Sequence, residues 1–265
     1  MSKRHRFSLA NNYALYYGQG QDELLSRFDV AVVEPAGQNK SAIQRLKDAG
    51  TLVLSYLSIM EIHSWSPEFK LLRDEDFLSF DGKPLMNNAY GTFMTSLASK
   101  RWQDIIYHRA GSLIFNSEYD GVFLDTIGDI EWPVIPESIR KQLIQGYMDF
   151  ISRLRQLKSD LIIVQNNGLE RLSSYSSGLI DGICWENPRF MDSDSMQWTE
   201  GMLDSLLGIR KESGIKIMLL MEEQEEHVHS IPKKAIDNGF LLYIAPKGYI
   251  SGVNPPADLK TIQMF

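Results

Sequence analysis

Eight short apolar runs recur along the chain, and helical segments separate most of them. The runs are rich in Val, Ile, Leu and aromatic residues and lie at 13–17, 28–35, 51–58, 121–128, 161–167, 181–187, 216–223 and 240–246. Between them, apolar residues recur with the 3.6-residue period of a helix, as they do over 42–49, 102–114 and 139–157. Pro136 precedes the longest of these segments and suits a first helical turn. Ser230, followed by Pro232, is predicted to cap a helix before the last strand.

The apolar runs are continuous rather than alternating, which is typical of parallel strands covered by helices on the outside. Eight strands favour a closed barrel over an open doubly wound sheet, which typically has about five or six. Neither a Gly-rich dinucleotide fingerprint nor a GxxxxGK[ST] loop is present. The sequence therefore predicts an α/β protein, a single (β/α)8 TIM barrel that occupies residues 12–252 of a single domain spanning 1–265.

One segment interrupts this rhythm. Residues 59–98, after the third strand, are polar and rich in turn residues, with SWSPEF and SFDGKPLMNNAYG. Loops that follow barrel strands build the functional face, so a long one is expected to form a wall or lid of the active site. A variable surface insertion is the alternative.

Composition and charge exclude several functions. The net charge of -7 disfavours binding to a nucleic-acid backbone. No stretch approaches the roughly 18 continuous apolar residues of a membrane span, and the basic start lacks the apolar core of a signal peptide, so a cytoplasmic location without membrane contact is expected. Cys184 is the only cysteine and is expected to be a buried thiol. His227 and His229 fit a solvated acidic loop better than a metal site, and no metal or other cofactor is predicted.

Acids and amides gather at the ends of the predicted strands. In a barrel, these positions surround the functional mouth. Asp125 follows three apolar residues of the fourth strand and Glu186 follows three of the sixth, so buried backbone carries both to the rim. The other polar residues at strand ends are Glu34, Ser58 with Glu61 just beyond, Asn166 with Asn167, and Glu222 with Glu223.

Two carboxylates that face one cleft can divide the roles of acid and base, because mutual repulsion and burial separate their pKa values. Glycoside hydrolysis is a common chemistry that needs only such a pair. Each acid could instead cap a helix or pair with a lysine. Aromatic residues near the rim suit sugar binding, and the candidates are Tyr16, Tyr56, Trp132, which lies in the loop after Asp125, and Tyr243.

The strand ends GVFLDTIGD at 121–129 and DGICWENPRF at 181–190 resemble those of glycoside hydrolase family 114, the endo-alpha-1,4-polygalactosaminidase family of TIM barrels. The segments YLSIME, FDVAVVEP and LIIVQNNG share the resemblance, which extends over about 12–252. It implies an endo-acting enzyme on a galactosamine-containing or related polysaccharide, and an extracellular location becomes an alternative to the cytoplasm.

The resemblance also implies roles for individual residues. The family's catalytic aspartate and glutamate correspond to Asp125 and Glu186, and by analogy with related alpha-glycosidases Asp125 is the nucleophile and Glu186 the acid/base. Tyr56, Ser58 and Glu61 match a YLSxxE pattern that lines the sugar site, and Glu34 and Asn166 are further candidates for substrate binding. A carboxyl separation of roughly 6.5 Å or more would instead favour inversion.

Two other functions stay open at this stage. A carbohydrate-binding barrel without turnover would use the same aromatic residues. A metal-dependent lyase or aldolase would need a lysine at a strand end, and only Lys247 is placed near one.

Overall fold

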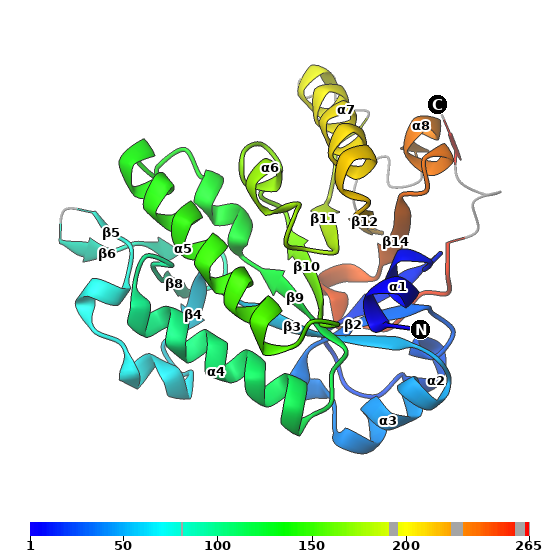
Figure 1. Cartoon of the computed structure of the whole chain (residues 1–265), viewed down its shortest axis with the longest axis horizontal. Helices are drawn as coiled ribbons and strands as arrows, with labels where there is room; N and C mark the ends of the chain where they lie inside the picture. The colour runs from blue at the N-terminus through cyan, green and yellow to red at the C-terminus, as the bar shows by residue number, and fades with distance from the viewer. Residues whose placement is uncertain (81, 191–195, 224–229, 258–262, 265) are drawn as a thin grey trace.

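The computed structural model describes residues 1–80, 82–190, 196–223, 230–257 and 263–264, and eight parallel strands form its centre (Figure 1). In order around the sheet they are β1 (Tyr13–Tyr16), β2 (Val30–Val33), β3 (Leu52–Ser58), β9 (Gly121–Asp125), β10 (Ile162–Asn166), β11 (Gly182–Glu186), β12 (Lys216–Glu222) and β14 (Leu241–Ala245). The two edge strands, β1 and β14, lie beside each other, and their Tyr13 and Tyr243 rings are 5.8 Å apart. The sheet is therefore a nearly closed barrel, which confirms the predicted (β/α)8 fold.

Helices flank the barrel, and three of them lie at the segments 42–49, 102–114 and 139–157 where the sequence period predicts them. The helices after the first are α2 (Asp22–Leu25), α3 (Lys40–Asp48), α4 (Lys100–Asn116), α5 (Glu137–Leu157), α6 (Leu172–Ser176), α7 (Met196–Ser213) and α8 (Lys233–Asp237). Asn39 and Ser99 cap α3 and α4 because each side chain accepts a hydrogen bond from a first-turn N–H. The prediction for Ser230 is wrong: it lies in β13 (Ser230–Ile231), which pairs with β15 (Gln263–Met264), and α8 begins only after Pro232.

Alternation along each central strand decides which side chains reach the mouth of the barrel. In β9, Val122 and Leu124 pack towards the helices, whereas Phe123 packs inside the barrel. Because successive side chains point to opposite faces of a strand, the next inward position is Asp125. The same alternation brings Asn166, Glu186 and Glu222 to the inward-facing ends of β10, β11 and β12.

The segment 59–98 has a structure of its own. It contains a three-stranded antiparallel sheet of β4 (Glu61–His63), β8 (Thr92–Met94) and β7 (Met86–Asn87), and a hairpin of β5 (Ser79–Phe80) and β6 (Lys83–Pro84). Two 3-10 turns, η2 (Pro67–Leu71) and η3 (Asp74–Asp76), complete it. This insertion, cyan in Figure 1, lies far from α7 and α8. A polar loop was predicted, but strands of two or three residues are too short for their periodicity to be read.

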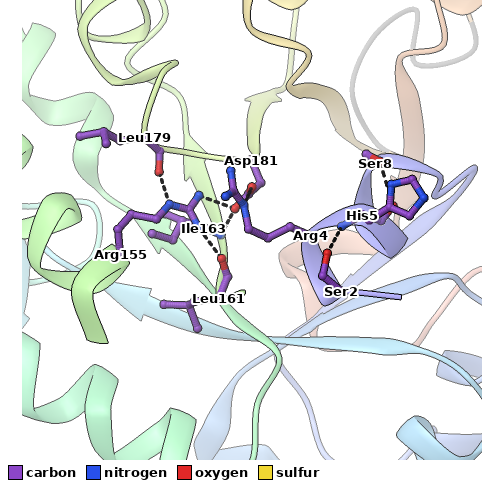
Figure 2. A network of polar contacts seen from close by, with 9 residues as sticks. All are labelled: Ser2, Arg4, His5, Ser8, Arg155, Leu161, Ile163, Leu179 and Asp181. Atoms are coloured by element: carbon purple, nitrogen blue, oxygen red, sulfur yellow. Dashed lines mark hydrogen bonds and ion pairs between the residues drawn. The ribbon is translucent and has the colours of Figure 1, made fainter. Parts of the chain in front are cut away.

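The basic N-terminus closes the end of the barrel opposite the mouth. Three aspartates immediately precede barrel strands, and each holds a residue of the first twelve: Asp29 accepts from the Asn11 N–H (2.7 Å), Asp120 pairs with Lys3 (2.7 Å) and Asp181 pairs with Arg4 (2.6 Å). Figure 2 shows Arg4 of α1 (Lys3–Ser8) and Arg155 of α5 converging on Asp181. The positive charge at the start of the chain is therefore structural.

Candidate active site

One amide group links the two carboxylates that the sequence singled out. Asn166 Nδ2 donates to Asp125 Oδ1 (2.7 Å) and to Glu186 Oε2 (2.8 Å). Since both hydrogen bonds share one nitrogen atom, these two oxygens lie at most the sum of the distances, about 5.5 Å, apart. For comparison, the carboxyl groups are about 5–5.5 Å apart in retaining glycosidases and about 6.5–9.5 Å apart in inverting ones.

Tyrosines hold the outer oxygens of the same pair. Tyr56 donates to Asp125 Oδ2 (2.7 Å), and Tyr249, in the 3-10 turn η5 (Lys247–Tyr249), donates to Glu186 Oε1 (2.6 Å). The Tyr17 ring lies edge-on to both of these rings, with centroids 4.8 Å from Tyr56 and 5.5 Å from Tyr249. Each carboxylate is therefore fixed by one tyrosine and by the shared amide.

Left-handed backbone after two strands orients the strand ends. Asn167 (φ 58°) follows β10 and Asn187 (φ 47°) follows β11, and asparagine is among the few non-glycine residues that adopt this conformation readily. Asn167 Oδ1 accepts from the Glu186 N–H (3.1 Å), and Asn187 Oδ1 accepts from the Glu222 N–H (3.0 Å). Each asparagine thus positions the last residue of the next strand.

The insertion is attached to the strand end that carries Asp125. Thr126, with φ at 64°, directs its hydroxyl so that it accepts from the Met60 N–H (2.8 Å). The Ser58 hydroxyl donates to the Glu61 carbonyl (2.8 Å), and the Glu61 side chain accepts from Asn87 Nδ2 (2.8 Å). Ser58 and Glu61, both predicted to contact substrate, thus hold the insertion against the barrel mouth.

Burial and like charge raise the pKa of two of the acids. Burial, together with the charge of Asp125, raises the pKa of Glu186, although the Tyr249 and Asn166 hydrogen bonds oppose this shift. Asp129 lies in η4 (Ile127–Glu131), and burial, the charge of Glu61 and a hydrogen bond to Glu61 raise its pKa to about 9. Asp129 Oδ2 is buried and has no hydrogen-bond partner within the described residues.

The remaining predicted site residues occupy different surroundings. Glu34 accepts from the Ala36 N–H (3.2 Å) and caps the 3-10 turn η1 (Pro35–Gly37), and burial raises its pKa. Trp132 is half-buried against the core. Tyr16 and Tyr243 are buried, and Tyr243 packs on Tyr13 and Phe28. Neither of these two tyrosines has an open face, and neither belongs to the site proposed below.

Tyr17 and Tyr249 complete the site, and Tyr249 was not predicted. Tyr17 directly follows β1, and alternation from Tyr13, whose hydroxyl lies beside the buried Cys184, favours it over Tyr16 as the inward-facing residue. Tyr249 lies four residues beyond β14, where no period applies. Cys184 is buried, as predicted, whereas His227 and His229 lie outside the described residues.

Two exposed aromatic residues belong to the insertion. Trp65 is 77% exposed and stacks on His63 at 4.6 Å, and Tyr90 is 73% exposed in the turn between β7 and β8. Burial and the charges of four carboxylates, with Glu186 and Asp125 foremost, raise the pKa of Tyr90. Tyr90 thus lies within electrostatic reach of the candidate pair. Because both rings are largely solvent-exposed, neither contributes much to the packing of the core, and both are free to contact a ligand.

The part of the chain that the structure describes holds neither a metal-ion cluster nor a membrane-spanning helix. No three His, Cys, Asp or Glu residues there gather in a way that would hold a metal ion. None of the helices there is both long and apolar enough to cross a membrane.

The bridged carboxylates, carried by β9 and β11, lie within a segment that matches a known family. The model of glycoside-hydrolase family GH114 matches residues 3–189, which is more than half of the chain. The chain belongs to this family. Its members are glycoside hydrolases, so the paired acids lie in a hydrolase fold.

Solved structures of glycoside hydrolases share the barrel. The glycoside hydrolase domain of PelA from Pseudomonas aeruginosa has 19% identity and a TM-score of 0.74, with 92% of this chain and 100% of that domain covered. Ega3 from Aspergillus fumigatus, in complex with galactosamine, has 13% identity and a TM-score of 0.65, with coverage of 92% and 93%. An alpha-galactosidase from Thermus thermophilus has 12% identity and a TM-score of 0.59, with coverage of 91% and 59%. None of the curated protein sequences compared with the chain matches it significantly.

Proposed function

We propose that this glycoside hydrolase cleaves alpha-glycosidic bonds within galactosamine-containing polysaccharides and retains the anomeric configuration. The observation that carries the proposal is the Asp125–Asn166–Glu186 bridge, which holds two carboxyl groups no more than about 5.5 Å apart at their bonded oxygens. Asp125 is the nucleophile and Glu186 the acid/base in this proposal.

The chemistry follows from the two environments. Glu186, whose raised pKa favours the protonated form, gives its proton to the leaving glycosidic oxygen while Asp125 attacks the anomeric carbon and the C–O bond breaks. The product is a covalent glycosyl ester on Asp125 and a free alcohol. Glu186, now a carboxylate, takes a proton from water, and the resulting hydroxide attacks the anomeric carbon and releases Asp125. Two inversions give net retention.

Charge at the mouth supports an amino sugar. Asp125, Glu186, Glu61 and Glu222 all lie close enough to act on Tyr90, so the mouth carries a concentrated negative potential. A sugar with a free ammonium group would be attracted there, whereas an N-acetylated sugar would not. Galactosamine is the ligand of the similarly folded Ega3, and this supports the same choice of sugar here.

The exposed rings on the insertion support endo action. An enzyme that cuts within a chain must bind sugar units on both sides of the broken bond, and flat aromatic faces are suitable platforms. We expect Trp65→Ala and Tyr90→Ala to raise KM about 10-fold on long oligomers while leaving the KM for the shortest cleaved oligomer within about two-fold. Equal effects on short and long substrates would contradict an extended binding surface.

The test uses alpha-1,4-linked galactosamine oligomers, with and without N-acetylation, and mass spectrometry of the products. Mid-chain products should appear from the unacetylated oligomers, and NMR of the first-formed reducing ends should show the alpha configuration. Asp125→Asn and Glu186→Gln should each lower kcat at least about 1,000-fold at unchanged melting temperature. Wild-type activity in both variants would refute the assignment, and binding without products would indicate a carbohydrate-binding barrel.

A further inference from the structure

Tyr249 touches the candidate acid/base from a segment that the family match does not include. The match ends at residue 189, whereas Tyr249 lies in η5, sixty residues further on. Its hydroxyl nevertheless makes the 2.6 Å hydrogen bond to Glu186 Oε1, and among the described residues it holds the Glu186 carboxyl group together with the Asn166 amide. The surroundings of Glu186 are therefore completed by the C-terminal part of the barrel.

The turn that carries Tyr249 is held in a demanding backbone conformation. Gly248 (φ 66°) and Tyr249 (φ 62°) are both left-handed, and a bulky residue adopts this conformation only when its surroundings impose it. Glu222 Oε2 accepts from the Gly248 N–H (2.9 Å), and the Tyr249 carbonyl accepts from the Tyr17 N–H (2.8 Å). Glu222 at the end of β12 and Tyr17 directly after β1 thus fix the turn so that the phenol points to Glu186.

We propose that Tyr249 is a positioning residue for Glu186, which keeps the carboxyl group directed at the glycosidic oxygen and stabilises the negative charge that appears when its proton leaves. This inference rests on the acid/base role of Glu186 proposed above. The hydrogen bond from a phenol to a carboxyl oxygen strengthens as that oxygen becomes charged. Tyr249 therefore contributes more in the transition state than in the ground state, which is the condition for raising kcat.

The charged and titratable groups around Glu186 determine how a substitution at Tyr249 changes the pKa of Glu186. They are Asp125 on β9, Glu222 on β12, Tyr13 and Tyr17 on and after β1, Cys184 on its own strand, Tyr90 in the insertion and Tyr249 itself. The charges of Asp125 and Glu222 raise the pKa of Glu186, whereas the Tyr249 hydrogen bond lowers it. Removal of the phenol and removal of the Glu222 charge should therefore have opposite effects.

The experiment compares three variants in the full chain on galactosamine oligomers. Tyr249→Phe should lower kcat about 10- to 100-fold with KM within about two-fold, and should move the alkaline limb of the pH–rate profile to higher pH. Glu222→Gln retains an acceptor for Gly248 but removes a charge, so it should move the same limb to lower pH. Tyr147→Phe is the matched control, because it removes a buried hydroxyl from α5 that donates to Gln165 Oε1 (3.1 Å), and its profile should equal that of the wild type.

A second measurement does not depend on turnover. In protein carrying 13C at the glutamate carboxyl groups, the Glu186 signal is assigned by its loss in Glu186→Gln, and its titration is compared between wild type and Tyr249→Phe. A midpoint at higher pH in the variant supports the inference, and an unchanged midpoint overturns it even if the wild type cleaves no oligomer. A wild type that cleaves, with Tyr249→Phe unchanged in both rate and titration, leaves the proposed function standing and refutes the role of Tyr249.

Discussion

Asn166 offers the sharpest test of how the two carboxylates are held together. Its amide nitrogen neutralises one oxygen of each acid, and the side chain is only 3% exposed, so water does not replace it readily. When both acids are ionised, unit charges about 5.5 Å apart repel by about 3 kcal/mol at an effective dielectric constant of about 20. Asn166→Ala leaves this repulsion unopposed and frees both carboxyl groups to rotate. We therefore expect kcat to fall about 100-fold, because misplacing reacting groups by about 1 Å can cost that much.

The assay is a pH–rate profile with melting temperatures measured in the same buffers. Loss of the Asn166 donor should raise the pKa of Glu186, so the alkaline limb of Asn166→Ala should move to higher pH. Asn166→Asp puts a third carboxyl group in the bridge, so its melting temperature should be depressed at pH 7 and recover as the pH falls towards 4.

The matched control for the Asn166 variants is Asn254→Ala. This change removes an amide that donates to Glu223 (2.6 Å), a carboxylate outside the site. It should leave the profile unchanged. If Asn166→Ala keeps more than about one fifth of the wild-type kcat with the same alkaline limb, the bridge does not organise the pair.

Two further predictions concern stability. Asp181 is nearly buried and accepts hydrogen bonds from Arg4, Arg155 and the Ile163 N–H. Asp181→Ala should therefore lower the free energy of unfolding in urea by about 3–5 kcal/mol while kcat stays within about two-fold. A loss under about 1 kcal/mol would contradict this structural role. The pKa of Asp129 is about 9 in the folded protein and near 4 in the unfolded chain, so between these pH values only the folded state holds the proton. The contribution of this proton to the free energy of unfolding is therefore complete below about pH 4 and is lost as the pH rises to 9. Asp129→Asn keeps a donor for Glu61 without needing that proton. Its advantage over the wild type in unfolding free energy should therefore grow from pH 6 to 9 by up to about 1.4 kcal/mol per pH unit, and its melting temperature should exceed that of the wild type by a growing margin. Parallel melting curves across this range would show that Asp129 is ionised.

The strands and the acids at their ends were predictable because both depend on local periods. An apolar run that ends in Asp125 or Glu186 needs only the repeat of a strand and the rule that barrel mouths collect polar residues. The choice between Tyr16 and Tyr17 also lay within reach, since a shift of one residue turns a side chain from the barrel interior to its outside. The antiparallel sheet of the insertion could not be predicted, because strands of two or three residues show no measurable alternation.

The place of Tyr249 in the site could not be predicted from the sequence, for a physical reason. Its place depends on the left-handed conformation of Gly248 and Tyr249, and this conformation depends in turn on a hydrogen bond from Gly248 to Glu222, a residue on another strand. A contact of this kind exists only after the barrel has closed. From the sequence, Glu222 was one more acid of the rim, but in the structure it has two effects on Glu186. Its charge raises the pKa of Glu186, and its side-chain hydrogen bond from the Gly248 N–H directs the Tyr249 phenol, which lowers that pKa. Substitutions that preserve the contact but not the charge separate the two effects, which is why Glu222→Gln is more informative than Glu222→Ala.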